Sequence, residues 1–148
     1  MAIPPFNEHG WLPDGIRECT LEEATGRLGA FQGSDRRPNL WAKFAEFLRE
    51  VKECGLVEAV LLDGSFVTAK PDPNDIDLIL VVSAEHDFSA DLRPIEYNVL
   101  SQRRVRRRFG FDLLVARTGS EEYRRYVGFF QQVRLEPGRR KGILRVRL

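Results

Sequence analysis

The chain has 148 residues, of which 43% are hydrophobic and 30% are charged, with a formal net charge of +1. This length and composition favour one globular domain over residues 1–148 with a buried core. The two cysteines form no Cys-x-x-Cys pair, which argues against a disulfide framework or a zinc site and favours a reducing compartment. Without a basic and apolar leader or an apolar run long enough to span a membrane, the sequence predicts a cytoplasmic protein with no membrane partner.

The charge is distributed unevenly along the chain. Residues 1–100 contain 9 Lys/Arg and 18 Asp/Glu, a net charge of −9, whereas residues 101–148 contain 14 and 4, a net charge of +10. A basic C-terminal third is typical of a protein that binds a polyanion such as nucleic acid. Docking of this basic third on the acidic remainder, or its simple solvation, explains the asymmetry equally well.

Residues 1–37 are rich in Pro, Gly and polar residues and predict an irregular N-terminal extension. Within it, a short helix is expected over residues 19–28. Thr20 is a suitable N-cap there, and Glu23, three residues later, completes a capping box.

A longer helix is predicted over residues 38–55, with Asn39 as its cap and Gly55 as its left-handed terminator. Its apolar residues recur at helical spacing and predict one buried face: Leu40, Trp41, Phe44, Phe47, Leu48 and Val51.

The rest of the chain alternates short apolar runs with helical patterns. Strands are predicted over 56–63, 75–82, 111–116 and, as an edge strand, 142–148; helices are predicted over 91–110 and 120–133, the latter capped by Ser120. This order predicts an α/β (α+β) fold in which helices flank a small mixed β-sheet.

Three carboxylates interrupt the apolar strands. Asp75 and Asp77 are two residues apart, which places them on one face of their predicted strand, and Asp112 lies in the next apolar strand. Carboxylates that converge in this way repel one another unless a cation neutralises them, and oxygen ligands favour Mg²⁺ or Mn²⁺. Asp112 pairing with a nearby arginine is the structural alternative.

The pair Gly64-Ser65 ends the strand that precedes these acids. Glycine allows a close backbone approach to a ligand, and the free N–H groups of a helical turn suit phosphate. Asp63, immediately before the pair, reads as a turn residue. A phosphate cradle followed by an acid pair is suited to a nucleoside triphosphate bound with two metal ions.

The segment "GSFVTAKPDPNDIDLIL" followed by "FDLLVA" resembles the polymerase-beta-type nucleotidyltransferase superfamily, especially its minimal nucleotidyltransferase branch. The resemblance covers residues 61–116, with Gly-Ser, a loop, Asp-x-Asp and an Asp on a later strand. The opening "IPPFNEHGWLPDGI" resembles the leader of an uncharacterised group of small bacterial proteins of this kind.

The resemblance implies a nucleotidyltransferase-like fold and assigns roles to individual residues. Gly64 and Ser65 would hold the triphosphate, while Asp75, Asp77 and Asp112 would bind the metals and form the catalytic set. The Arg-Gly often found in the loop is replaced by Thr68-Ala69-Lys70, so Lys70 is the candidate phosphate contact, a solvated loop lysine being the alternative.

Five arginines in six positions lie near the end of the helix before Asp112. These are Arg103, Arg104, Arg106, Arg107 and Arg108. They suit the helix dipole, and they also suit an RNA backbone or the phosphates of an NTP.

The resemblance therefore implies a Mg²⁺-dependent nucleotidyltransferase that transfers a nucleoside monophosphate from NTP to a hydroxyl of a protein or RNA acceptor. Relatives of this size resemble components of toxin–antitoxin or defence modules, which implies a cognate partner protein. Two alternatives remain at this point: a non-catalytic module that binds nucleotide, RNA or a partner protein, and a nucleic-acid-binding protein whose basic third carries the function.

Overall fold

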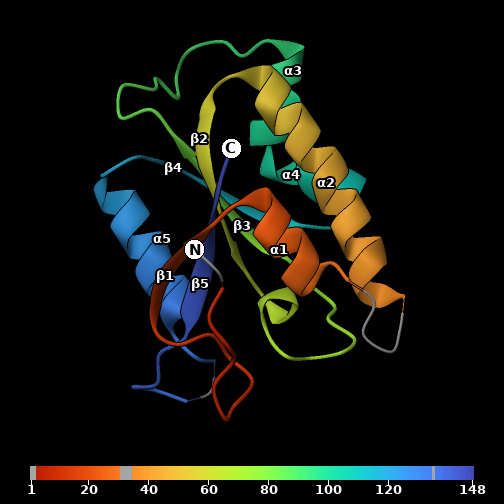
Figure 1. Ribbon diagram of the computed structural model, residues 1–148. Coiled ribbons are helices and arrows are strands. Elements are labelled where there is room, and N and C mark those ends of the chain that lie inside the picture. The colour runs from red at the N-terminus through yellow and green to blue at the C-terminus, as the bar shows by residue number, and fades with distance from the viewer. Residues whose placement is uncertain (1–2, 31–34, 135) are drawn as a thin grey trace.

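Residues 3–30, 35–134 and 136–148, which the computed structural model describes, form a five-stranded mixed sheet with helices on both faces (Figure 1). The strands are β1 (Gly15–Cys19), β2 (Val57–Asp63), β3 (Asp77–Val82), β4 (Asp112–Arg117) and β5 (Gly142–Arg147). The helices are α1 (Leu21–Leu28), α2 (Arg36–Cys54), α3 (Pro94–Leu100), α4 (Gln102–Phe109) and α5 (Glu121–Gln131). The predicted fold class is confirmed.

The sheet has the strand order β1-β5-β2-β3-β4. Strand β2 is antiparallel to both of its neighbours, whereas the outer pairs β1/β5 and β3/β4 are parallel. Strand β4 thus forms one edge of the sheet, and the strands that carry the predicted acids are adjacent.

Side-chain alternation along the strands divides the core into two layers. Leu78 and Leu80 of β3 face α1 to α4, where they join a large aromatic cluster that includes Phe44 and Phe47 of α2. Ile79 and Val81 face the other way and pack with residues of α5. Figure 1 shows α5 on one side of the sheet and the longer α2 on the other.

Several predicted elements are confirmed in detail. Helix α1 has the predicted capping box: the hydroxyl of Thr20 accepts from the N–H of Glu23, and the Glu23 carboxylate accepts from the N–H of Thr20. Gly55 ends α2 with a φ of 73°, and the hydroxyl of Ser120 caps α5 by accepting from the N–H of Tyr123.

Other predictions are wrong. The extension over 1–37 is not wholly irregular, because Gly15–Cys19 forms β1 and pairs in parallel with β5. For the same reason β5 is an interior strand rather than an edge strand. Helix α2 begins at Arg36, so Asn39 lies within it and does not cap it.

The predicted helix over 91–110 is two helices, because Ser101 leaves the helical conformation and caps α4. Among the described residues, no helix is both long and apolar enough to cross a membrane.

Candidate active site

Three aspartates form a row across neighbouring strands at one end of the sheet. Asp77 is the register partner of Asp63 on β2 and of Asp112 on β4. Neighbouring strands lie roughly 4.8 Å apart, and alternation places all three side chains on the face that α5 covers. The row therefore concentrates three carboxylates within a short span of the sheet.

Asp77, at the centre of the row, is strongly perturbed. Burial raises the pKa of this carboxyl from its ordinary value of 3.8 to about 6, and repulsion from Asp75, Asp63 and Asp112 acts in the same direction. Lys141 opposes the rise without cancelling it. An ionised Asp77 thus lies in a position that favours an additional cation.

Asp63 has such a cation within reach. Nζ of Lys141, the residue before β5, donates to Oδ1 of Asp63 over 2.7 Å, and both side chains are largely shielded from solvent. Burial raises the pKa of the Asp63 carboxyl, with Lys141 opposing the rise. Sequence reasoning dismissed Asp63 as a turn residue, because its register with Asp77 and its contact with a residue 78 positions away are not visible in the local pattern.

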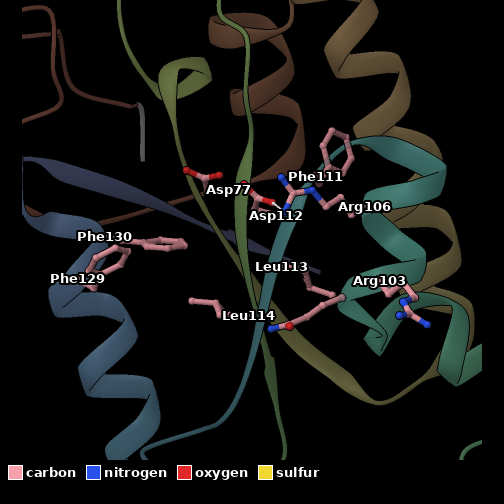
Figure 2. Close-up of a pocket in the computed structure, with 10 residues that line it drawn as sticks. Asp77, Arg103, Arg106, Phe111, Asp112, Leu113, Leu114, Phe129 and Phe130 are labelled. Carbon is pink, nitrogen blue, oxygen red and sulfur yellow. Dashed lines mark ion pairs between the residues drawn. The ribbon is translucent and has the colours of Figure 1, made fainter. Parts of the chain in front are cut away.

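At the other end of the row, Asp112 forms an ion pair with Arg106 of α4. Nη1 of Arg106 lies 3.2 Å from Oδ1 of Asp112, and the two side chains are 74% and 59% exposed. A dashed line marks this ion pair in Figure 2. The structural alternative for Asp112, an arginine partner, is realised. Such exposed pairs contribute roughly 1 kcal/mol or less, so Arg106 can be displaced at little cost.

Asp75 is positioned differently from the prediction, because β3 begins at Asp77 and Asp75 precedes it in the loop. Its Oδ1 accepts from the N–H of Ser65, over 3.0 Å, and from the Ser65 hydroxyl. The Ser65 hydroxyl in turn accepts from the N–H groups of Asn74 and Asp75. Asp75 and Asp77 therefore do not share a strand face, and Asp75 accepts hydrogen bonds from the Ser65 groups that the sequence predicted for phosphate.

Gly64 brings the two segments together. Its φ of 92° lies in the region that favours glycine, and a Cβ at this position would lie 2.9 Å from the carbonyl oxygen of Asp75 and 3.2 Å from the nitrogen of Asp77. The close approach that the sequence predicted is therefore made to the Asp-x-Asp segment of the protein itself.

The loop after Ser65 is anchored to α2 by the side chain of Arg37, which is only 1% exposed. Its guanidinium donates to the carbonyl oxygens of Phe66, Thr68 and Lys70, and it lies over the Phe66 ring. Burial lowers the pKa of Arg37. The carbonyl oxygen of Lys70 is thus held by Arg37, while Lys70 itself is exposed to solvent. Nothing in the local sequence distinguished Arg37 from a surface arginine.

A cleft of about 650 Å³, called here the β4 cleft, opens beside this edge strand. It is lined by Asp77 and Asp112, by Gln102, Arg103 and Arg106 of α4, by Phe111, Leu113 and Leu114, and by Phe129 and Phe130 of α5. Figure 2 shows Asp77, Asp112 and Arg106 close together, with Phe129 and Phe130 of α5 on the other side of β4 from Arg106. Two carboxylates of the row thus face a cleft with room for a ligand.

The donor set suits a hard divalent cation, because it consists of carboxylate and hydroxyl oxygens. In the described parts of the chain, however, no three His, Cys, Asp or Glu side chains are arranged as a metal site. Asp63, Asp75 and Asp112 each have a protein partner instead. Asp77 with Asp112 could hold Mg²⁺ or Mn²⁺ once Arg106 moves away, and Asp75 could join them by leaving Ser65.

The five clustered arginines have different surroundings. Arg108 binds Glu50 of α2 through two hydrogen bonds of 2.7 Å, and Arg104 lies over the ring of Tyr97. Arg103 and Arg106 line the β4 cleft, whereas Arg107 is exposed on the same helix. Ion pairs from Arg108, Arg140, Lys141 and Arg145 to acidic residues of the first hundred show that the basic third does dock in part on the acidic remainder.

A model of one protein family, described as a family of unknown function (DUF6932), matches residues 4–147. The chain belongs to this family. No curated protein and no solved structure matches the sequence. The DUF6932 match covers β1, the row of aspartates and β5 alike, so the N-terminal segment and the basic third belong to the same family unit as the Gly-Ser and Asp-x-Asp segment.

Proposed function

We propose that this DUF6932 protein is a Mg²⁺- or Mn²⁺-dependent nucleotidyltransferase, which transfers a nucleoside monophosphate from NTP to a hydroxyl group. The observation that carries the proposal is the row Asp63, Asp77 and Asp112, in which burial and the repulsion of neighbouring carboxylates raise the pKa of Asp77 to about 6. Perturbed carboxylates beside a cleft are typical of functional sites. The N–H and hydroxyl of Ser65, in the turn beside the row, donate to Asp75 and would serve a phosphate once Asp75 is released.

In the proposed reaction, the acceptor oxygen attacks the α-phosphorus of NTP. A new oxygen–phosphorus bond forms, the bond to the pyrophosphate oxygen breaks, and the hydroxyl proton passes to a carboxylate, for which Asp112 at the open end of the row is best placed. Bound divalent cations would stabilise the charge on the α-phosphate and on the leaving pyrophosphate. Ser65 would donate its N–H and hydroxyl to the triphosphate in place of Asp75, and Lys70 would add a positive charge.

Thermal stability in the presence of nucleotide tests this proposal. We expect NTP to raise the melting temperature only with Mg²⁺ or Mn²⁺, and Asp77→Asn to abolish that rise. The matched control is Asp91→Asn, an exposed aspartate outside the row, which should behave as wild type. Protection that persists unchanged in folded Asp77→Asn would show that the metal site is wrongly assigned.

Incubation with the four α-labelled NTPs and a cell extract would then identify the acceptor. Label on a protein or on RNA supports transfer and names the acceptor class. A cytoplasmic role with a cognate partner protein, as in toxin–antitoxin or defence modules, belongs to this proposal and is supported by analogy alone.

The second candidate is a binding module without catalysis. It is favoured by one specific observation: Asp75 and Asp112, two of the three predicted metal ligands, are bound to Ser65 and Arg106. This candidate predicts that NTP or RNA binds equally well with and without divalent cations and that no macromolecule becomes labelled.

A further inference from the structure

We infer that the outer edge of β4 binds an extended acidic segment of a partner protein, which pairs with β4 and adds a strand to the sheet. The inference is independent of the proposed function, because it involves neither nucleotide nor metal. It is carried by the open edge of β4, by the β4 cleft beside this edge and by the charge of α4.

Strand β4 is an unpaired edge of the sheet. It pairs in parallel with β3 from Asp112 to Arg117, and in the described parts of the chain no strand or bridge pairs with its outer side. The outward N–H and C=O groups of such a strand are a template for pairing with another chain. The six residues of β4 match the usual length of a strand, so an added strand of ordinary length can pair with it.

The sequence of β4 does not protect this edge. Natural edge strands are commonly protected by internal charges, by proline or by bulges. The other edge strand, β1, has Arg17 and Glu18 within it, whereas the inner residues of β4, Leu113–Ala116, are all apolar. The register of β4 with β3 also runs without a shift. An apolar and regular edge of this kind is suited to a partner strand.

The β4 cleft gives the added strand a place to lie. It has a volume of about 650 Å³, and Leu113 and Leu114 of β4 line it together with residues of α4 and of α5. Figure 2 shows that β4 separates the two sides, with Arg106 on the α4 side and Phe129 on the α5 side. Because successive side chains of a strand point to opposite faces, a peptide paired with β4 directs alternate side chains to these two sides.

The α5 side favours an apolar side chain. Phe129 is 68% exposed on this side, and Leu114, which packs with the core residues under α5, is only partly buried. Residues directly opposite each other on paired strands place their side chains on the same face. An apolar peptide residue opposite Leu114 would therefore cover apolar surface that is otherwise exposed to water.

The α4 side favours an acidic side chain. Helix α4 contains five arginines and no acidic residue, so the electrostatic potential on this side is positive. Arg106 lines the cleft, and its exposed pair with Asp112 is weak enough to be exchanged. A carboxylate of the peptide can therefore accept hydrogen bonds from the Arg106 guanidinium.

The same charge decides between a partner protein and a second copy of this chain. Antiparallel pairing of β4 with β4 of a second copy would place both α4 helices on the same face of the continuous sheet. Five arginines would then approach five arginines, which is unfavourable. An acidic segment has the opposite charge and is favoured instead.

The test is fluorescence anisotropy with a labelled peptide of six alternating Glu and Val residues, equal in length to β4. EDTA is present and nucleotide is omitted. We expect this peptide to bind and a matched peptide of alternating Lys and Val not to bind. Arg106→Gln should weaken binding about fivefold by removing one exposed ion pair, and Phe129→Ala about tenfold by removing apolar contact.

Two variants serve as matched controls. Arg107 is exposed on α4 without lining the cleft, and Phe88 is another exposed phenylalanine outside the cleft. We expect Phe88→Ala to leave binding unchanged and Arg107→Gln to weaken it by less than about twofold, as a general electrostatic contribution does. Thermal melting verifies that the four variants are folded.

Backbone methylation of the peptide tests strand pairing itself. In a paired strand, the N–H groups of alternate residues point to the same neighbour, so the Glu N–H groups face one way and the Val N–H groups the other. Two acidic peptides are therefore compared, one N-methylated at its Glu residues and the other at its Val residues. We expect one of them to lose binding at least tenfold and the other to bind within about threefold of the unmethylated peptide.

Absence of binding, equal losses in the cleft and control variants, or equal binding of the two methylated peptides would overturn the inference. A chain that does not bind the peptide but sediments as a dimer, dissociated by Phe129→Ala, would also overturn it and would assign the edge to a second copy. Cation-dependent protection by NTP is measured without peptide, so its presence or absence tests the proposed function alone.

Discussion

Replacement of Asp77 by asparagine should make the cation-free protein more stable at neutral pH. Asp77 is the central carboxylate of the row, and its neighbours Asp63 and Asp112 contribute to the repulsion that acts on it. Asparagine has nearly the same shape but no charge, so it removes this repulsion and the cost of burying an ionised group. Stabilisation by a substitution in a functional site is expected where the site is built for a ligand rather than for folding.

The size and pH dependence of the effect follow from the pKa of Asp77. Because the folded-state pKa of about 6 exceeds the ordinary value of 3.8, the folded protein holds this proton more tightly than the unfolded chain does. The stabilisation that the folded protein gains from binding this proton on Asp77 is therefore fully present below pH 3.8, and it is lost as the pH rises through about 6. The full difference corresponds to roughly 3 kcal/mol, which Asp77→Asn should recover above that pH.

Urea denaturation of wild type, Asp77→Asn and Asp91→Asn at pH 4 and pH 7.5 measures this effect. We expect the free energy of unfolding of Asp77→Asn to exceed that of wild type by about 3 kcal/mol at pH 7.5 and by far less at pH 4. Addition of Mg²⁺ should stabilise wild type and narrow the gap, by about 1.4 kcal/mol when the ion is present at ten times its Kd. A variant that is less stable than wild type at pH 7.5, or a difference that does not change with pH, would refute the electrostatic account of the row.

Three other substitutions test the supports of the site by urea denaturation. Gly64→Ala should lower the free energy of unfolding by about 2 kcal/mol, because the added Cβ would lie 2.9 Å from the carbonyl oxygen of Asp75. Gly119→Ala, which also has a positive φ but open space around it, should lower it by about half as much. Equal losses would contradict the close approach at Gly64. Arg37→Met should lower the free energy of unfolding by about 3 kcal/mol, because it leaves buried carbonyl oxygens unpaired. Arg49→Met, at an exposed position of the same helix, should change it little. Lys141→Met should cost about 3 kcal/mol at neutral pH by leaving a shielded carboxylate uncompensated, and a neutral result would show that the ion pair is dispensable.

Local patterns were sufficient to predict most of the fold. Apolar runs with β-branched residues predicted β2, β3 and β4, and the helical spacing from Leu40 to Val51 predicted the core of α2. The capping box at Thr20 was equally visible, because it depends on residues three positions apart. Strand β1 was missed because "GIREC" is short and half polar, and its strand character comes from pairing with β5, over a hundred residues away.

The candidate site was predictable in its residues more than in its contacts. The spacing of Asp75 and Asp77 indicated a shared strand face, but the hydrogen bonds from Ser65 hold Asp75 in the loop. Asp63 was overlooked because a residue before Gly-Ser resembles any turn aspartate. Its role is apparent only from its register with Asp77 and its ion pair with Lys141, both of which are products of the tertiary fold.

The interior position of β5 has a consequence for the order of folding. Residues 142–147 lie between β1 and β2, so β1 can join β2, β3 and β4 only together with β5 or after β5 has paired with β2. Lys141 arrives with the same strand and neutralises Asp63. Before that step the row would hold an uncompensated extra charge. The sheet and the charge balance of the site are therefore completed together, by a strand from the far end of the sequence, so that a partly folded chain lacks a formed site.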